Sequence, residues 1–555
     1  MVFIFWLGNG LKNETMCSEN DHREAWLSAK GWELLLWAVI SGYFCLILIL
    51  SLSYHWGYLS TMADVGTFDQ AVWGILNGEP FLNTSIFSTP INFLGVHFKP
   101  ILLCFIPFYA VLPAVEWMIL AQSIALAITA WPIYLLGIRV FNVKAAAFLF
   151  ALTYLVNPFV LSVPPWVFRP ESLVLPFIAF SMLGIEKGNW GLTLLSCFVI
   201  LLCKEHFGIM VCGIGILWWL RNKDFKGAFV LFLFGLLHVT LVLSVIMPIF
   251  SPTGKHLMIT GNLGQLSRYA WLGSSGTEII RTVLTHPLSV LKIVICDMGG
   301  KTYFIALLLP FLGLPLAGIE FLLLPGLADF AANTLSANPM PRSIFAYHSV
   351  TIIPIITAAA IYGTKRISIL TERNRLINML GAAILITNLL LGYFFSPLPL
   401  AGAINYWAPT QLINNIDPDI EKVQSVLPEN YSVSVQANVG AHFSQRHEIY
   451  VYPNKIKEVD AVILRLMSPT QKVEMNHDYP PELQKSITGS LDAHLQMNRN
   501  EYIRSIEQLL EGDKYGVLLW QDPWLVLSRK FQDEKDLSNI KSKLEELRIE
   551  WKVDN

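Results

Sequence analysis

Long apolar runs in the first 396 residues constrain this chain more than any other feature, because uncharged runs of about 20 residues can cross a bilayer as helices. The distribution of charged residues agrees with a membrane-spanning N-terminal part. Residues 397–555 carry 40 of the 80 Asp, Glu, Lys and Arg side chains, which is about 25% and typical of a soluble domain. The other 40 are spread over the first 396 residues. We therefore predict a polytopic α-helical membrane body with a soluble C-terminal domain.

Composition excludes several other classes of protein. Only 14% of the residues are charged and 54% are hydrophobic, which argues against a wholly soluble enzyme. The net charge of −2 gives no bulk field for a nucleic-acid partner. The seven cysteines include none in residues 397–555 and no metal-ligand spacing, so a disulfide framework and a zinc site are poorly supported.

The apolar runs predict about eleven transmembrane helices within residues 34–396. Residues 1–33 carry Lys12, Arg23 and Lys30 and lack a signal-peptide pattern with a small-residue cleavage site, so they are predicted to be a cytoplasmic N-terminal segment. The run Pro100–Pro113 is too short for a span and is predicted to be interfacial or re-entrant. The predicted spans lie near 34–52, 116–137, 144–161, 172–186, 190–203, 206–220, 226–248, 301–317, 318–328, 347–363 and 376–396.

The positive-inside rule orients these spans in the cell membrane. With eleven crossings, the N-terminus is cytoplasmic, and the large loop 54–115, the loop 249–300 and the C-terminal domain 397–555 are extracytoplasmic. The cations that this scheme places in the cytoplasm are Lys12, Arg23, Lys30, Arg139, Lys144, Lys187, Arg221, Lys223, Lys226, Lys365, Arg366, Arg373 and Arg375.

Residues 397–555 read as alternating short strands and helices, which predicts a small α/β domain. The expected strands are Tyr431–Gln436, Ile449–Tyr452, Ala461–Leu466, Gly516–Trp520 and Trp524–Leu527. The expected helices are about Pro418–Val426, Asn500–Glu511 and Glu534–Trp551.

Two carboxylates follow the first predicted span. Asp64 lies in an apolar loop just outside the span, which makes it a candidate base or metal ligand; the alternative is a turn-forming Asp beside Gly66. Asp69 is placed near the start of a short helix that runs to about Leu76. There it is a second candidate, or simply a first-turn acid that complements the helix dipole.

Further ionisable residues gather on the same predicted side of the membrane, where polar groups call for a functional explanation. Lys99 has the alternative role of an interface anchor, and Arg169 and Glu171 have the alternative of a local ion pair. The remaining members of this set are His97, Lys204, Glu205, His206, Asp329, Arg342, Tyr347 and His348.

These residues together resemble a family of predicted membrane proteins, the domain of unknown function 2079, over about residues 40–530. The resemblance is carried by Asp64-Val-Gly-Thr-Phe-Asp69-Gln70-Ala-Val-Trp73, His97-Phe-Lys-Pro100, Arg169-Pro-Glu171, Lys204-Glu205, Tyr347-His348 and His442-Phe-Ser-Gln-Arg446. That family is similar to the GT-C class of membrane glycosyltransferases, which includes protein O-mannosyltransferases, aminoarabinose transferases and oligosaccharyltransferase catalytic subunits.

The resemblance implies an enzyme that transfers a sugar from a polyprenyl-phosphate-linked donor to an acceptor on the outer face. Asp64 best matches the acidic residue of the first outer loop, with Asp69 second, and Glu171 matches the acid of the next loop; a divalent metal, if one is used, would fall to Asp64 and Glu171. In one departure from the mannosyltransferases, Val65 replaces the second acid of an Asp-Glu pair. The lipid phosphate is expected to contact His97, Lys99, Arg169, Lys204, Glu205, Arg342 and His348.

The physical requirements of such a transfer agree with these residues, because it needs a base for the acceptor hydroxyl and cations for the leaving phosphate at the membrane interface. The expected partners are a lipid-linked sugar donor and membrane lipid, with the acceptor left open. Two other functions stay open as alternatives. A transporter or flippase would require inverted repeats and charges at the bilayer midplane. A non-catalytic membrane receptor would use the C-terminal domain for binding.

Overall fold

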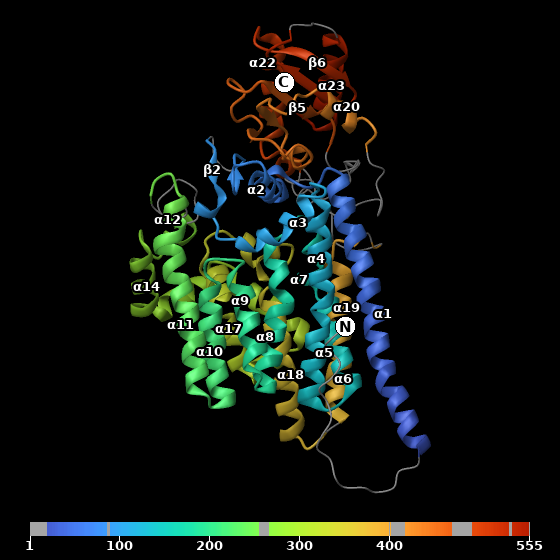
Figure 1. Ribbon diagram of the computed structural model, residues 1–555, viewed down its shortest axis with the longest axis vertical. Helices are drawn as coiled ribbons and strands as arrows, with labels where there is room; N and C mark the ends of the chain where they lie inside the picture. The colour runs from blue at the N-terminus through green and yellow to red at the C-terminus, as the bar shows by residue number, and fades with distance from the viewer. Residues whose placement is uncertain are drawn as a thin grey trace.

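The structure is a computed structural model that describes residues 19–85, 89–254, 266–373, 375–398, 400, 417–468, 491–531 and 536–553. A tall helical body forms most of the molecule, and a smaller α/β domain, residues 417–553, lies on one end of it (Figure 1). We call this end of the body the domain end. The expected C-terminal α/β region is therefore present.

The body is built from helices that run mostly along its long axis (Figure 1). They are α1 (Glu19–Trp56), α4 (Glu116–Ile128), α5 (Ala130–Phe141), α6 (Lys144–Leu155), α7 (Pro158–Leu161), α8 (Leu175–Lys187), α9 (Trp190–Leu201), α10 (Phe207–Asn222), α11 (Phe225–Leu241), α12 (Met247–Phe250), α14 (Gly276–Thr285), α15 (Pro287–Cys296), α16 (Gly300–Leu308), α17 (Ile319–Leu335), α18 (Ile352–Leu370) and α19 (Arg375–Phe395).

Six of the helical segments in the described ranges are long and apolar enough to cross a membrane, or up to eight if each of two bent pairs counts as one span. The six are Lys30–Trp56, Glu116–Phe141, Phe225–Phe250, Leu314–Leu335, Ile352–Leu370 and Arg375–Phe395. Other predicted spans correspond to shorter apolar helices such as α9 and α10, so the count of eleven stays a prediction.

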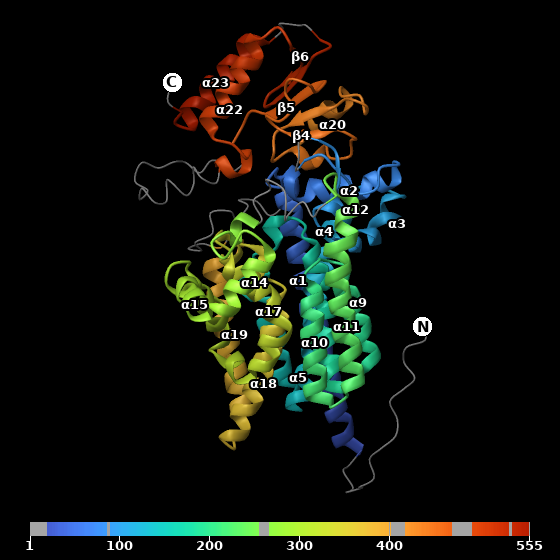
Figure 2. The ribbon, with the colours of Figure 1, turned by 90° about the vertical axis from the view of Figure 1, so that its left-hand side faces the viewer.

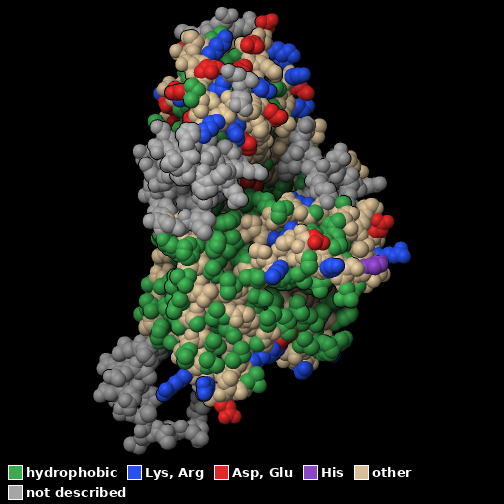
Figure 3. Space-filling model, turned by 180° about the vertical axis from the view of Figure 1, so that it is seen from behind, with side chains coloured by type: hydrophobic (Ala, Val, Ile, Leu, Met, Phe, Trp, Pro, Cys, Tyr) green, Lys and Arg blue, Asp and Glu red, His purple; other side chains and the backbone are tan. Residues whose placement is uncertain are grey.

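The surface of the body has the polarity of a membrane protein. On the face that Figure 3 shows, apolar side chains form a broad band across the body, whereas charged side chains gather over the C-terminal domain, near it, and at the opposite end of the body. Within the bundle, close helix contacts occur at small residues. A Cβ on Gly213 would stand 1.8 Å from the carbonyl oxygen of Leu324, so α10 and α17 could not approach so closely with a larger residue there.

Three segments differ from the expectation. The predicted break between spans at residue 317/318 falls instead at Leu312 and Gly313, which both adopt left-handed backbone conformations. Helix α17 then continues to Leu335, so Asp329 lies in a helix and not in a loop. The predicted loop 249–300 contains α14 and α15, a pair bent by 96°, whose apolar side chains the sequence analysis left unassigned.

The segment between α1 and α4 packs on the domain end of the body. A single π-helical turn, Met62–Gly66, leads directly into α2 (Thr67–Leu76), as expected for the short helix with Asp69 near its start. A small hairpin follows, formed by β1 (Leu82–Asn83) and β2 (Ile91–Asn92). Pro100–Phe105 and α3 (Ile106–Tyr109) are short helices, which agrees with a segment that does not span the membrane.

The C-terminal domain contains a five-stranded mixed sheet in the order β4-β3-β5-β7-β6. All five strands and three helices coincide with the expected ones. Strand β3 is parallel to β4 and β5, whereas β5–β7 and β7–β6 are antiparallel. The elements are α20 (Ile420–Ser425), β3 (Val433–Val435), β4 (Ile449–Val451), β5 (Ala461–Arg465), α22 (Arg499–Glu511), β6 (Gly516–Gln521), β7 (Trp524–Ser528) and α23 (Leu537–Glu550).

The two faces of this sheet have different neighbours. Because side chains alternate along a strand, β5 directs Val462 and Leu464 toward α22 and α23, which lie together on one side of the sheet (Figure 2). Ala461 and Ile463 join the other face, whose apolar core also includes Tyr58 and Met62 of the body. The sheet therefore completes its second core with residues from the segment that carries Asp64.

Candidate active site

Asp64 forms an ion pair with Arg169 at the domain end of the body. Asp64 lies in the π-helical turn, an arrangement found often at functional sites, and its Oδ2 accepts a hydrogen bond of 2.9 Å from Thr61 Oγ1. The Arg169 guanidinium donates to Asp64 Oδ1. Asp64 keeps 29% of its side-chain surface exposed, against 8% for Arg169. Asp64 is therefore a reachable carboxylate whose orientation is fixed by two donors.

The guanidinium of Arg169 is held between two aromatic rings. It lies 4.8 Å from the ring centre of Trp166 and 4.1 Å from that of Tyr347, so cation–π attraction orients it. Its backbone N–H donates to Gln122 Oε1 at 2.8 Å. The nearby Val167 has φ of +60°, which costs a β-branched residue energy and is typical of functional sites. The loop is thus built to place Arg169.

Glu171 does not pair with Arg169, so the local ion pair considered as an alternative is not formed. Its Oε1 is 2.8 Å from Lys99 Nζ and 3.2 Å from Lys204 Nζ. Burial alone would raise the pKa of Glu171, but the two ammonium groups hold it well below its usual range. Burial likewise would lower the pKa of Lys204, and Glu171 more than offsets this and raises it. The three groups carry a net charge of +1 at neutral pH.

Two histidines extend this cluster. His97 Nδ1 lies 3.4 Å from Glu205 Oε1, and the pKa of Glu205 is lowered because its interaction with His97 outweighs burial, which would raise it. His206 Nε2 lies 2.7 Å from Asp329 Oδ1, and Thr351 donates to the other oxygen at 2.6 Å. Each carboxylate in this region thus has its own partner.

His348 stands beside the cations without pairing with them. Its ring stacks on Tyr347 with centres 4.2 Å apart, and its Nδ1 is buried with no hydrogen-bond partner among the described residues. Burial, together with the Lys204 and Arg169 charges, lowers the pKa of His348 to about 3. It is therefore a neutral imidazole at physiological pH.

Arg342 has a different environment from the other predicted phosphate ligands. Its guanidinium donates to the carbonyl oxygens of Asn333, at 3.0 Å, and Ser336, at the C-terminal end of α17. Carbonyls at a helix end lack intrahelical donors, so Arg342 satisfies and caps this end. No described contact joins it to Asp64 or Glu171.

Asp69 connects the body to the C-terminal domain. It accepts hydrogen bonds from Tyr109 Oη at 2.7 Å, Ser444 Oγ at 2.5 Å and Gln445 Nε2 at 3.2 Å. The side chain is buried, and desolvation raises its pKa to about 6 despite these donors. Asp69 lies in the first turn of α2, as expected, and these hydrogen bonds also make it a junction residue between the body and the C-terminal domain.

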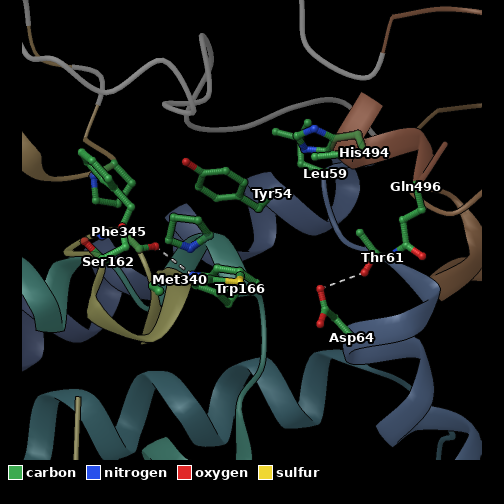
Figure 4. Close-up of a pocket in the computed structure, with 15 residues that line it drawn as sticks. Tyr54, Leu59, Thr61, Asp64, Ser162, Trp166, Met340, Phe345, His494 and Gln496 are labelled. Carbon is green, nitrogen blue, oxygen red and sulfur yellow. Dashed lines mark hydrogen bonds between the residues drawn. The ribbon is translucent and has the colours of Figure 1, made fainter. Parts of the chain in front are cut away.

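A cavity of about 390 Å³ lies beside Asp64. Figure 4 shows Asp64 and Thr61 at one side of it, Trp166, Met340 and Phe345 at another, and His494 and Gln496 of the C-terminal domain along its edge. Sequence reasoning did not identify most of these wall residues, because apolar side chains at loop positions carry no local signal. The lining residues are Tyr54, Leu59, Thr61, Asp64, Ser162, Pro165, Trp166, Met340, Ser343, Phe345, Ala346, Pro397, Ala493, His494 and Gln496.

The donor set fits a metal ion poorly. Within the described ranges, no group of three or more His, Cys, Asp and Glu side chains is arranged to hold a metal. Asp64 and Glu171, the expected ligands, are each neutralised by cationic side chains. The electrostatic work that a divalent cation would do at these carboxylates is already done by Arg169, Lys99 and Lys204.

The structure brings six predicted residues into one electrostatic unit. The charges of Asp64 and Glu171 both raise the pKa of Arg169. The charges of Lys204, Arg169 and Glu171 all affect the pKa of His348. The residues joined in this way are Asp64, Lys99, Arg169, Glu171, Lys204 and His348. His97 and Glu205 adjoin it, while Asp69 and Arg342 serve the junction and a helix end.

The fold and site define a multi-span membrane protein with a charged cluster at one end of its helical body. The chain belongs to the family described as predicted membrane protein (DUF2079), whose profile matches residues 54–509. This confirms the family expected from the sequence. No curated protein matches the chain.

Two solved structures are similar to the chain. ArnT from Cupriavidus metallidurans in the apo state has a TM-score of 0.46 and 14% identity, covering 90% of this chain and 98% of that one. The Archaeoglobus fulgidus oligosaccharyltransferase, tethered by a disulfide bond to an acceptor peptide with the NVT sequon, has a TM-score of 0.38 and 15% identity, covering 76% and 69%.

Proposed function

We propose that this protein is a membrane glycosyltransferase that moves a sugar from a polyprenyl-phosphate-linked donor to an acceptor on the extracytoplasmic face. The observation that carries the proposal is the position of the Asp64–Arg169 pair, with Asp64 on the wall of a cavity and Arg169 two residues before Glu171, which pairs with the buried Lys99 and the partly buried Lys204. Asp64 can contact an acceptor in the cavity, and Arg169 can contact a phosphate.

Asp64 acts as the general base in this reaction. It removes the proton from the acceptor hydroxyl while that oxygen attacks the anomeric carbon of the sugar. The new bond between carbon and the acceptor oxygen forms as the bond to the phosphate oxygen breaks, and the electron pair leaves with the polyprenyl phosphate. The products are a glycosylated acceptor, a polyprenyl phosphate and a protonated Asp64.

Arg169 and Lys204 stabilise the leaving phosphate, because fixed cations in a site shielded from water are most effective where negative charge develops. Arg169 can offer a phosphate two parallel donors, and the phosphate then competes with Asp64 for this guanidinium. Donor binding would in this way release Asp64 from its ion pair and make it a better base.

Lys99 and Glu171 hold Lys204 in place. Removing Glu171 would leave two ammonium groups close together with their buried counter-ion lost, which is costly. Glu171 is therefore a positioning residue in this proposal, since both cations contact its Oε1. The neutral imidazole of His348 completes the same side, with its Nδ1 able to contact a donor oxygen.

The positive-inside pattern supports the orientation that this function needs. With the N-terminus in the cytoplasm, the Asp64 turn and the C-terminal domain lie outside, at the membrane surface where the headgroup of a lipid donor would lie. The charged cluster then stands at the interface and not along the depth of the bilayer, as a transport path would require.

The test is release of polyprenyl phosphate, a product common to every acceptor. The full-length protein in proteoliposomes is incubated with undecaprenyl phosphates that each carry a different sugar, with a membrane lipid extract as the source of acceptor, and released undecaprenyl phosphate is measured by mass spectrometry. We expect release with at least one donor, and its loss in Asp64→Asn. Equal release from the variant, or none with any donor, would overturn the proposal.

A further inference from the structure

We infer that the cavity between the membrane body and the C-terminal domain is the acceptor site, and that it takes a neutral lipid bearing a hydroxyl group. This inference rests on the proposed function, because it takes Asp64 as the base. A general base must lie within hydrogen-bond reach of the proton that it removes, and Asp64 lines this cavity. The donor phosphate would then bind Arg169 and Lys204, which do not line this cavity.

The charges around the cavity favour a neutral ligand. Among the described residues that line it, Asp64 is the one Asp, Glu, Lys or Arg, whereas Lys99 and Lys204 are not part of the lining. Once a donor phosphate has taken over the Arg169 guanidinium, an anionic acceptor would meet an unpaired Asp64 carboxylate with no lysine or arginine in the cavity wall to offset the repulsion. A hydroxyl group can instead donate its hydrogen to Asp64 at no such cost.

The walls favour a lipid over a peptide. They consist mainly of apolar and aromatic side chains, including Tyr54, Leu59, Trp166, Met340 and Phe345, and the volume of about 390 Å³ is within the range of small-molecule sites. A buried peptide needs a partner for each backbone N–H and C=O group, whereas nine of the fifteen lining residues are apolar or aromatic. A hydrocarbon chain needs no such partner.

The position of the cavity is also suitable for a lipid. Tyr54 lies in the last turn of α1, and Pro397 comes just after α19. Both helices are candidate membrane spans, so the cavity lies at the level where two spans end. A lipid could place its hydroxyl group at Asp64 while its chain remains close to the bilayer.

The C-terminal domain completes the cavity. Ala493, His494 and Gln496 line it from the domain side, where Figure 4 shows His494 and Gln496 near Thr61. Gln496 adopts φ of +54°, a conformation that costs energy for a residue other than glycine and is found often at ligand sites. The domain is therefore part of the acceptor site, and a lipid bound there would contact a soluble domain.

The test is photocrosslinking of full-length protein in dioleoylphosphatidylcholine nanodiscs. The probe is hexadecanol with a diazirine near its hydroxyl end, and the matched anionic probe is the corresponding hexadecyl phosphate. Mass spectrometry identifies the labelled peptides. We expect the alcohol to label the peptide that contains residues 493–496 at least tenfold more than the phosphate does, and excess oleyl alcohol to suppress this label.

Filling the cavity provides the matched variants. Ala346→Trp places a large ring in the wall, and Ser343→Trp does so from a less buried position, in case the first variant fails to fold. Ala337→Trp, at an exposed position of the same loop, is the control. We expect about tenfold less labelling of residues 493–496 in the two cavity variants and unchanged labelling in the control.

Each contrary outcome overturns the inference. No suppressible label on residues 493–496, equal labelling by the two probes, or labelling by a benzophenone-bearing Ser/Thr peptide in place of the alcohol would each do so. Because binding is measured without turnover, a failure of the proposed function has a separate signature. In that case the alcohol labels the cavity as expected, yet no donor yields polyprenyl phosphate.

Discussion

Asp64 and Asp69 are five residues apart in the chain and have contrasting environments. Asp64 is partly exposed on the wall of a cavity and pairs with a cation. Asp69 is buried and accepts hydrogen bonds from neutral groups of the body and of the C-terminal domain. The π-helical turn followed by α2 directs the first carboxylate to the cavity and the second to the junction. Two acids that are close in the sequence can therefore have different roles.

The largest difference between the two residues is expected in catalysis. Asp64→Asn should lower polyprenyl phosphate release by about 10²–10⁴-fold, because a general base contributes about that much. The thermal unfolding temperature of the variant should remain close to that of the wild type, since an amide keeps the bond from Thr61. Asp69→Asn is the matched control, and a comparable loss in that variant would contradict the different roles assigned to the two acids.

Arg169→Lys tests whether the Asp64–Arg169 ion pair requires a guanidinium group or only a positive charge. The substitution keeps the positive charge but loses the planar group held between Trp166 and Tyr347, together with its paired donors. We expect about a 10–100-fold lower rate of release, corresponding to about 1–3 kcal/mol of transition-state stabilisation. If lysine supports the wild-type rate, charge alone is sufficient and the stacked geometry is not needed.

Asp69→Ala tests the junction. The variant leaves the buried Tyr109 hydroxyl without its acceptor, while Ser444 Oγ keeps the Ala441 carbonyl but loses its link to the body, and a buried unsatisfied group costs about 1–3 kcal/mol. Limited proteolysis should therefore cleave between the body and the C-terminal domain faster than in the wild type. Asp513→Ala, an exposed acid of the same domain, is the control, and equal cleavage of the two variants would contradict the role assigned to Asp69.

The smallest expected effect is a dependence of junction stability on pH. The pKa of Asp69 in the folded protein, about 6, is above the value of about 4 for an unfolded aspartate. The folded state therefore binds the proton more tightly, and stability rises as the pH falls through 6 toward 4. Between pH 7.5 and 5.5 the gain is about 1 kcal/mol.

This dependence is measured as the rate of junction proteolysis at the two pH values. Cleavage should be slower at pH 5.5, with the protease calibrated at both values on an unstructured substrate. Asp69→Asn should remove the dependence, because an amide does not titrate. A wild-type junction that is cleaved faster at the lower pH would show that another group controls it.

Local patterns in the sequence predicted much of the fold. Short apolar runs such as Ala461–Arg465 and its neighbouring strands are visible in the sequence, and all five strands of the domain were expected. The short helix that contains Asp69 was also expected. The break at Leu312 and Gly313 was missed, because two flanking apolar runs mask where a chain reverses, and so were α14 and α15.

The candidate site was predicted as a collection of residues but not as a set of pairs. Arg169 and Glu171 are two residues apart, which indicated a possible local pair, yet the intervening turn separates their side chains. Arg169 meets Asp64, and Glu171 meets Lys99 and Lys204. Arg342 could not be distinguished from a phosphate ligand, because its helix-capping role depends on where α17 ends.

The sequence by itself determined the helical membrane body, the C-terminal α/β domain and the gathering of ionisable residues in a few segments, since hydrophobicity and charge act over short stretches of chain. Only the tertiary structure decided which charges pair, because Asp64 and Arg169 are 105 residues apart. It also decided that residues 493–496 complete a cavity beside Asp64. The physical reason is that the second face of the sheet buries its apolar residues against Tyr58 and Met62 of the body.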